Sequence, residues 1–169
     1  FPGTTVSGVY QSSYGDGSGV GLDAFVAKVK SNGSGIDWAT YIGAIKSDYG
    51  NDIVIDGSGN PIIVGYTAST TAITSPIAAG NSSNDAFVIK FNGSTGAKIW
   101  GTYVGGSSND YGRAIDLDDS GNIYIAGDTS SSGSNSIPGI SGTYNSGRDA
   151  FVAKLDSRGT LLWRSYLGG

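Results

Sequence analysis

Apolar and polar residues along the chain follow a pattern that favours short β-strands. Brief runs rich in Val, Ile, Phe, Tyr and Trp are bounded by Gly, Ser, Asn or Asp, and no run has the 3.6-residue period of a helix. Two stretches, DGSGN at 56–60 and DDSGN at 118–122, supply the residue types of tight hairpin turns. We therefore predict an all-β protein built from antiparallel strands.

The strand pattern recurs as a repeat. The hexamer DAFVAK at 23–28 returns as DAFVIK at 85–90 and as DAFVAK at 149–154, each time followed by a Trp-x-x-Tyr run. Residues 48–67 also match 110–129 at a constant offset of 62. The pattern predicts four strands in each repeat unit. The DAFV run is the third and the Trp-x-x-Tyr run is the fourth.

The predicted strands are apolar on both faces, as in AFVAKV and IYIAG. A strand that is apolar on both faces is covered on both faces. Four-stranded antiparallel units that repeat in this way predict the blades of a β-propeller, with a repeat of about 62 residues. The first strands are predicted to begin at Gly50 and Gly112, and we expect the Trp and Tyr of the fourth strand to pack between neighbouring blades.

The repeats divide the chain into the outer half of a blade at 1–44, a full blade at 45–106 and another full blade at 107–169. Propellers contain about 4–8 blades, so we expect this chain alone to form an incomplete ring. Its ends would expose apolar blade faces and a strand edge. The chain is then a segment of a longer protein, one of several copies in a ring, or a unit of an open stack.

The repeated pattern also supports a family resemblance. The run D-A-F-V-A-K-L-D-S-x-G-T-L-L-W-x-x-Y-L-G-G, followed by D-Y-G-x-A-I-x-x-D-x-S-G-N-I-Y-I-x-G-x-T, resembles the bacterial and archaeal β-propeller repeat abbreviated SBBP. The resemblance covers two full repeats and part of another. It implies a propeller and an extracellular or cell-surface (secreted) location, but no defined activity. Propellers of this family contain more copies than this chain does.

Several residue types are absent from the chain. It has no Cys, Met, His or Glu, and all 14 acidic residues are Asp. Disulfides and the usual zinc, copper and haem ligands are therefore excluded. The net charge of −4 and the scattered basic residues argue against nucleic acid, and no stretch is long enough for membrane insertion. Without His or Glu we expect no enzyme, although an Asp pair acting on a glycan is a less favoured alternative.

Candidate ligand-binding residues lie in long loops on one face of the predicted propeller. The loops at 1–22, 68–84 and 130–148 join second to third strands, and the fourth-to-first loops at 44–50 and 105–112 lie on the same face. Loops on a rigid scaffold often bind ligands. Tyr stacking and Asn hydrogen bonding suit a carbohydrate, whereas the alternative is a set of solvated loops without a ligand. The candidates are Tyr10, Tyr14, Asn81, Asn109, Tyr144 and Asn145.

A calcium site is a further candidate, formed by Asp116, Asp118 and Asp119. The equivalent positions in the other unit include Val54 and Gly57, which cannot supply carboxylates. The favoured interpretation is an Asp that accepts backbone N–H bonds in an Asx turn. We therefore predict no cofactor, with calcium as the alternative.

Two further sets of residues recur in turns and strands. An Asp and a Lys five residues apart begin and end each DAFV run, and recurrence in every unit favours a structural hydrogen-bond or ion-pair network. These residues are Asp23, Lys28, Asp85, Lys90, Asp149 and Lys154. Three N-glycosylation sequons begin at Asn32, Asn81 and Asn92.

From these observations we predict a non-catalytic extracellular scaffold or binding module that acts in adhesion or contacts glycans. The expected partners are other blades of the same parent protein or identical chains, met through the end blade faces, together with carbohydrate. The alternative is a structural subunit that self-assembles through exposed blade faces into a ring or surface filament.

Overall fold

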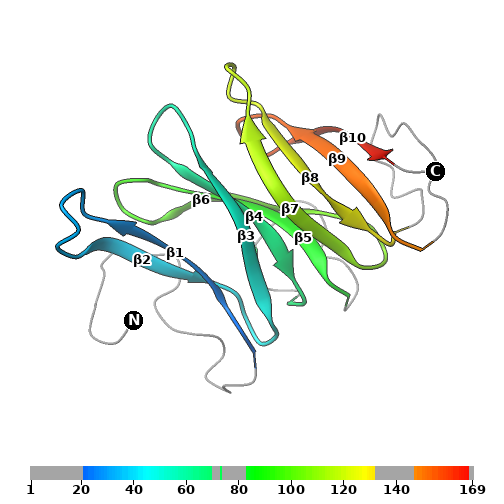
Figure 1. The fold of residues 1–169 in the computed structure, drawn as a ribbon, viewed down its shortest axis with the longest axis horizontal. Coiled ribbons are helices and arrows are strands. Elements are labelled where there is room, and N and C mark those ends of the chain that lie inside the picture. The colour runs from blue at the N-terminus through cyan, green and yellow to red at the C-terminus, as the bar shows by residue number, and fades with distance from the viewer. Residues whose placement is uncertain (1–20, 70–72, 74–82, 132–146, 168–169) are drawn as a thin grey trace.

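The computed structural model describes residues 21–69, 73, 83–131 and 147–167. These ranges contain ten strands and no helix, as Figure 1 shows. The strands are β1 (Ala24–Val29), β2 (Ile36–Ile42), β3 (Asp48–Ile55), β4 (Pro61–Thr67), β5 (Asp85–Phe91), β6 (Lys98–Val104), β7 (Asp110–Leu117), β8 (Ile123–Thr129), β9 (Asp149–Leu155) and β10 (Leu161–Leu167). In this part of the chain no helix is long and apolar enough to span a membrane.

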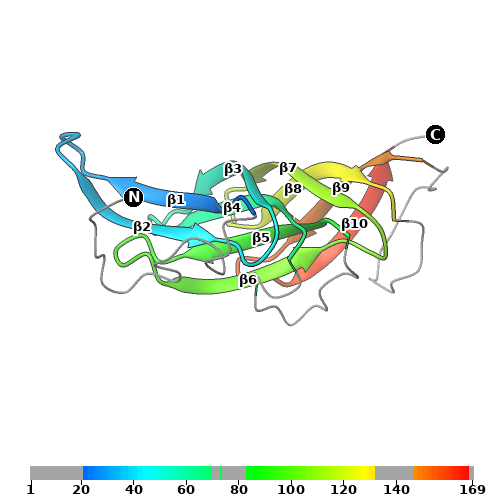
Figure 2. The ribbon, with the colours of Figure 1, turned by 90° about the horizontal axis from the view of Figure 1, so that it is seen from below.

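The strands form three antiparallel sheets that follow the order of the sequence. We call β1–β2 the half blade, β3–β4–β5–β6 the first blade and β7–β8–β9–β10 the second blade. The three sheets lie one after another along the molecule, with the half blade at one end (Figures 1 and 2). The all-β prediction is confirmed, because four-stranded antiparallel sheets are stacked like propeller blades without closing into a ring.

The first strand of each full blade begins two residues earlier than predicted. It starts at Asp48 in β3 and at Asp110 in β7. A β-bulge between Gly50 and Asp52 shifts the register, so that Tyr49 still pairs with Tyr66 at the end of β4. The Asp-Tyr pair therefore belongs to the sheet and not to the preceding loop.

The core lies between the blades, as the two-sided apolar pattern predicts. The side chains of Phe87 and Ile89 in β5 are fully buried, and they belong to a cluster that also contains Val26 and Trp38 of the half blade. A second cluster joins the first blade to the second blade. It includes Ile62, Val64, Val88, Ile115, Ile125 and Leu155.

The Trp of each fourth strand fastens its blade to the next one. Trp38 is 3% exposed, its Nε1 donates a hydrogen bond to the carbonyl oxygen of Gly93 (3.1 Å), and its ring covers Gly96 in the outer turn of the first blade. The prediction that this Trp packs between blades is confirmed. The next junction uses the same contacts, from Trp100 to Ser157 and Gly159.

The Tyr of the fourth strand also makes a hydrogen bond within its own blade. The hydroxyl of Tyr103 donates to the carbonyl oxygen of Ser69 (3.2 Å), and that of Tyr166 donates to the carbonyl oxygen of Ser131 (2.9 Å). Both carbonyls lie just after the second strand. The Tyr therefore holds the start of the long loop against the outer strand.

Candidate functional site on the loop face

Aromatic and charged side chains gather where the first strands begin and the second strands end, an end of the blades that we call the loop face. The rings of Tyr49 and Tyr66 are stacked, with centroids 4.7 Å apart and planes at 17°. The Tyr66 and Tyr111 rings meet edge to face at 4.7 Å, which connects the first blade to the second. We call the whole group the rim cluster. Its members are Tyr49, Tyr66, Tyr111, Arg113, Asp128 and Arg148.

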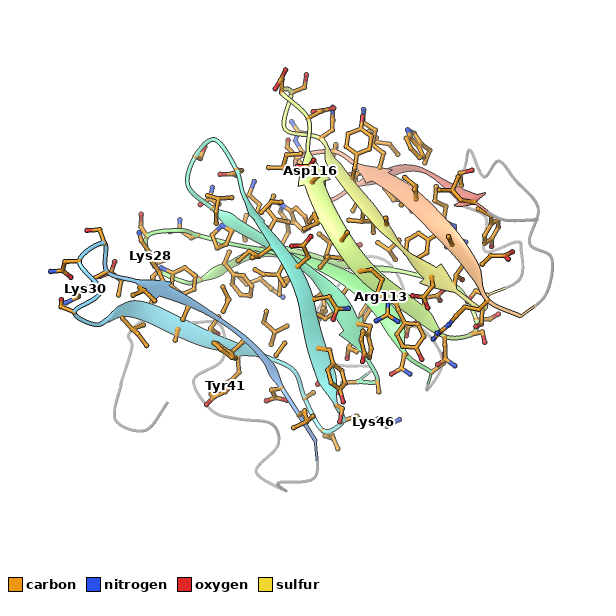
Figure 3. All side chains as sticks on the ribbon, viewed as in Figure 1. Lys28, Lys30, Tyr41, Lys46, Arg113 and Asp116 are labelled. Atoms are coloured by element: carbon orange, nitrogen blue, oxygen red, sulfur yellow. The ribbon has the colours of Figure 1, made fainter. Side chains whose placement is uncertain are left out.

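Two guanidinium groups flank the ring of Tyr111. The distance from the ring centroid is 4.9 Å for Arg113 and 4.6 Å for Arg148, within the range of a cation–π contact. The Nε atoms of the two arginines bind opposite oxygens of Asp128, at 2.6 and 2.8 Å. Figure 3 shows Arg113 among ring side chains near the start of β7.

The rim cluster carries an excess of positive charge at the surface. The hydrogen bond that Arg113 donates to Asp128 raises the pKa of Arg113, and burial raises the pKa of the Tyr66 phenol. Arg113 is therefore cationic and Tyr66 neutral at physiological pH. The arginine side chains are 47% and 54% exposed. Two guanidinium groups share one carboxylate, and the cluster can therefore attract an anionic group.

The rim cluster breaks the repeat, and this explains why the sequence pattern alone does not identify it. Tyr49 and Tyr111 are equivalent, but Tyr66 pairs across the sheet with Tyr49, whereas Asp128 pairs with Tyr111. Arg113 likewise stands where the first blade has Asn. Two features of the sequence together point to these residues. One is the Tyr of each Asp-Tyr-Gly run, and the other is the difference between Tyr66 and Asp128 at equivalent positions of the second strands.

One predicted ligand-binding residue lies close to the rim cluster. The side-chain oxygen of Asn109 accepts hydrogen bonds from the backbone N–H (3.0 Å) and the Nδ2 (3.2 Å) of Asn84. The same Nδ2 donates to the Tyr111 hydroxyl (3.1 Å), so Asn109 is joined to the cluster through Asn84. The other predicted residues lie outside the described ranges: Tyr10, Tyr14, Asn81, Tyr144 and Asn145.

The calcium candidates lie at the opposite end of the second blade, with Asp116 near the end of β7 and Asp118 and Asp119 in the turn to β8. Asp118 Oδ1 accepts the backbone N–H groups of Ser120 (3.0 Å) and Asn122 (2.8 Å), the contacts of an Asx turn. The hydrogen bond from the Asn122 side chain holds the pKa of Asp118 at about 2. Across the described ranges, no three acidic side chains come together as metal ligands. Asp116 and Asp119 are both exposed.

The recurring Lys of the third strand binds the hairpin turn of its own blade. Lys90 Nζ lies 2.8 Å from Asp56 Oδ2, and Lys154 Nζ lies 3.5 Å from Asp118 Oδ2. The predicted ion-pair role is confirmed for these two lysines, although the partner is the turn Asp. Lys28 of the half blade instead donates to the carbonyl oxygen of Gly93 (2.9 Å). The Asp residues that begin the third strands, Asp85 and Asp149, are buried.

The Asp that begins each first strand organises the loop between blades. Asp110 is buried, and its Oδ2 accepts the backbone N–H of Gly106 (2.8 Å) and the hydroxyl of Ser131 (2.9 Å). Burial raises the pKa of Asp110, and Asp48 behaves in the same way in the first blade. The buried guanidinium of Arg164 lies nearby and donates to the Gly105 carbonyl oxygen (2.9 Å). This group is structural.

Two of the three sequon asparagines lie in outer turns that the structure describes. Asn32 is exposed, and its side-chain oxygen accepts the N–H of Ser34 (3.0 Å). Asn92 is half-buried and accepts the N–H groups of Ser94 (2.9 Å) and Thr95 (3.0 Å). Both side chains therefore shape their turns, and glycosylation remains a prediction for them and for Asn81.

Comparison with protein families agrees with this architecture. Residues 99–133 match the family model described as a β-propeller repeat. The matched segment runs from β6 through β8 and so crosses from the first blade into the second. The stacked sheets and this match define a β-propeller repeat protein. The matched segment is similar to a repeat of the SBBP type. No curated protein matches the chain.

Proposed function

We propose that the chain is a non-catalytic β-propeller module that serves as an extracellular scaffold and contacts acidic carbohydrate through the rim cluster. The rim cluster is the observation that carries the proposal. Tyr rings pack on the apolar faces of sugars, and exposed guanidinium groups bind carboxylates in a bidentate manner. The secreted location rests on the family resemblance, and cell fractionation of the source organism tests it.

Calorimetric titration tests the carbohydrate contact. We expect an oligogalacturonate to bind and a neutral cello-oligosaccharide to bind at least about tenfold more weakly, because only the acidic sugar engages Arg113 and Arg148. Binding should also weaken at high salt, since both arginines are near the surface. Equal affinity for both oligosaccharides, or no binding of either, would overturn the proposal.

Variants locate the contact on the molecule. Tyr66→Ala and Arg148→Ala should each reduce affinity about tenfold or more. Tyr41→Ala is the matched control, because Tyr41 lies on the half blade, away from Arg113, as Figure 3 shows. If Tyr41→Ala weakens binding as much as Tyr66→Ala, the contact does not lie at the rim cluster.

The non-catalytic part of the proposal rests on the chemistry of the cluster. Asp128 is its one carboxylate, and both of its oxygens face guanidinium groups, an arrangement that suits binding and not proton transfer. We expect oligogalacturonate to be recovered intact after prolonged incubation with the protein. Chromatographic detection of shorter products that disappear with Asp128→Asn would favour the glycan-active enzyme instead.

A structural, self-assembling subunit is the second candidate, and the two ends of the stack favour it. Gly96 and Gly159 each hold a Trp ring from the preceding blade, whereas a side chain added at Gly33 in the half blade would meet open space. At the other end, Trp163 of the second blade is half-buried. Trp163 of one copy can therefore dock on the Gly33 turn of the next, a head-to-tail contact.

Light scattering over a range of protein concentrations tests this assembly. We expect the mass to rise above that of one chain and to return to it with Trp163→Ala. Ile99→Ala is the control, because Ile99 is an exposed apolar residue on the outer strand of the first blade. The mass of a single chain at every concentration would contradict the self-assembling subunit.

A further inference from the structure

Two cationic side chains of the rim cluster share a single anionic one. Arg113 and Arg148 place their Nε atoms 2.6 and 2.8 Å from opposite oxygens of Asp128. Asp110 and Asp149, which adjoin cluster residues in the sequence, are buried inside the second blade at 1% and 9% exposure. The surface of the cluster therefore carries one uncompensated positive charge, which a monoanionic group on a ligand would neutralise.

The same contacts leave the outer edges of both guanidinium groups accessible to a ligand. Asp128 occupies the Nε atom of each arginine, and no hydrogen bond from the Nη atoms reaches another described residue. The side chains of Arg113 and Arg148 are 47% and 54% exposed. Each guanidinium group therefore keeps its two Nη groups, which form a fork that can bind two oxygens of one ligand.

Tyr111 and Asp128 hold the two guanidinium groups near each other. The Cζ atoms of Arg113 and Arg148 lie 4.9 and 4.6 Å from the centroid of the same Tyr111 ring. The Tyr111 hydroxyl accepts a hydrogen bond from the side chain of Asn84 (3.1 Å), which anchors the ring to the first blade. A cation–π contact and an ion pair thus restrain each fork. We call Tyr111, Arg113, Asp128 and Arg148 the arginine clamp.

A sulfate ester can use both forks of the arginine clamp, whereas one fork satisfies a carboxylate. A carboxylate has two oxygens in one plane, which match a single guanidinium fork. A sulfate ester has three terminal oxygens arranged as a pyramid, so one arginine can bind two of them and the other arginine the third. Both groups are monoanions, and the difference between them is geometric. A phosphate monoester carries about −1.5 to −2 at pH 7 and would exceed the single positive charge of the cluster.

The tyrosines beside the arginine clamp suit a sugar that carries the sulfate. The Tyr66 ring meets Tyr111 edge to face and stacks on Tyr49, which is 36% exposed. Arg113 lies 5.8 Å from the centroid of Tyr66, so the cationic and aromatic parts of the rim cluster adjoin. A sulfated glycan can contact both parts at once, whereas free inorganic sulfate would contact the clamp alone.

We propose that the rim cluster recognises a sulfate ester on a carbohydrate, and that Arg113 distinguishes this group from a carboxylate. Arg148, the more exposed of the two arginines, supplies the fork that either acid group binds. Arg113, which donates a hydrogen bond to Asp128 and contacts two rings, supplies the additional bond to the third sulfate oxygen. This inference rests on the proposed function and names the acid group that the same site takes.

Calorimetric titration with two ligands that differ only in the acid group tests the inference. One is cellotriose with a single 6-O-sulfate, and the other is cellotriose with the same carbon oxidised to a carboxylate. Both are titrated into the complete 169-residue chain. We expect the sulfated ligand to bind at least about tenfold more tightly. Equal affinities, or tighter binding of the carboxylated ligand, would overturn the inference and leave the proposed function standing. Binding of neither ligand would overturn both.

Substitutions that keep the charge but remove the fork assign the contacts to the two arginines. Arg113→Lys should weaken binding of the sulfated ligand at least about tenfold and change that of the carboxylated ligand less than about twofold. Arg148→Lys should weaken the binding of both. Arg158→Lys is the matched control, because Arg158 is exposed in the turn between β9 and β10, at the opposite end of the second blade. Equal losses for the two ligands with Arg113→Lys would contradict its role in specificity.

Removal of Asp128 separates the geometry of the clamp from its charge. Asp128→Ala increases the net positive charge of the rim cluster, and attraction by charge alone would then strengthen binding of the sulfated ligand. We expect the affinity to fall at least about threefold instead, because both forks lose the carboxylate that positions them. A higher affinity in this variant would show that the site attracts anions without a clamp, and the inference would be wrong.

Two further ligands distinguish a sulfated sugar from other sources of the same acid group. Inorganic sulfate lacks the ring that contacts the tyrosines, and a short peptide with one sulfotyrosine presents a different ring. We expect each to bind at least about tenfold more weakly than the sulfated cellotriose. If either ligand binds as tightly as the sulfated cellotriose, the carbohydrate part of the inference is wrong.

Discussion

At the scale of single residues, glycines of the outer turns show how the same backbone shape is put to different uses. Gly33 and Gly96 have nearly identical φ values of 71° and 72°, a left-handed conformation that favours Gly. A Cβ at Gly96 would lie 2.8 Å from the ring of Trp38, whereas one at Gly33 would meet no atom within 4 Å. Gly96 is therefore constrained by its backbone and by a neighbouring blade.

This pair of glycines gives a matched prediction. Gly33→Ala should lower the free energy of unfolding by about 1–2 kcal/mol, the cost of a left-handed Ala. Gly96→Ala should cost at least ~1 kcal/mol more, because the Trp38 ring must also move. Urea denaturation of the two variants measures the difference. Equal losses would show that the Trp38 contact contributes little to stability.

The aspartates also differ according to their surroundings. Burial acts to raise the pKa of Asp56, but the hydrogen bonds from Lys90 and Asn60 outweigh it and hold the pKa at about 2, below the ordinary 3.8. Burial is dominant at Asp48 and Asp110 and raises the pKa of both. Because the pKa of Asp56 is depressed, its carboxylate contributes its full stabilisation above about pH 4. This contribution is lost as the pH falls through about 2.

We predict that Asp56→Asn makes the loss of stability between pH 4 and pH 2 shallower. The variant should be less stable than the parent chain at pH 7, and the two should converge below about pH 2, where Asp56 of the parent is protonated. Asp116→Asn is the control, because the Asp116 carboxylate is exposed. Chemical denaturation at a series of pH values is the measurement, and parallel pH curves for parent and Asp56→Asn would refute the prediction.

At the scale of elements, equivalent strands differ because of what precedes them. β3 and β7 have the same length and the same bulge, but β7 packs on a complete blade and β3 on a half blade. Ile115 and Ile53 occupy equivalent positions and differ in exposure, 6% against 48%. The energetic role of a repeat position therefore depends on its place in the stack.

The same substitution at these two positions should have unequal effects. Ile115→Ala removes a buried side chain from the second apolar cluster and should cost about 2–5 kcal/mol. Ile53→Ala should cost less than about 1 kcal/mol, since half of that side chain is already in water. Thermal unfolding monitored by circular dichroism compares them. A large loss for Ile53→Ala would contradict the exposure of Ile53 in the structure.

The strands and turns could be predicted from the sequence because they recur in every unit. Each apolar run became a strand, and the predicted turn residues such as Gly59 and Gly121 have positive φ. The rim cluster could not be predicted in this way, because it depends on a bulge that brings Tyr49 opposite Tyr66. A periodic pattern reveals what the units share, whereas this site arises from where they differ.

At the scale of the whole molecule, the sheets form a one-dimensional stack in which each blade depends on its neighbours. The first blade is covered on one side by the half blade and on the other by the second blade. Stability in such a stack is approximately a sum of blade and junction contributions, so interior strands are the most protected. Within the part of the chain that the structure describes, the half blade packs against one neighbour only, the first blade.

Hydrogen exchange should reveal this gradient. We expect the amides of β5 to exchange most slowly, because β5 is paired on both edges and fully buried at Phe87 and Ile89. The amides of β1 should exchange faster, since β1 belongs to the two-stranded sheet at one end of the stack. Mass spectrometry of peptic fragments measures both. Equal protection of the β1 and β5 amides would contradict a gradient of local stability along the stack.

The segment that matches the family model has an evolutionary consequence, because it is out of phase with the blades. Residues 99–133 take the outer strand of one blade together with the two inner strands of the next. Trp100 of this segment fastens the first blade to Ser157 of the second blade, which lies outside the segment. A duplication that preserves this junction must therefore copy a whole repeat of about 62 residues, and the boundary of the copied unit need not coincide with the boundary of a blade.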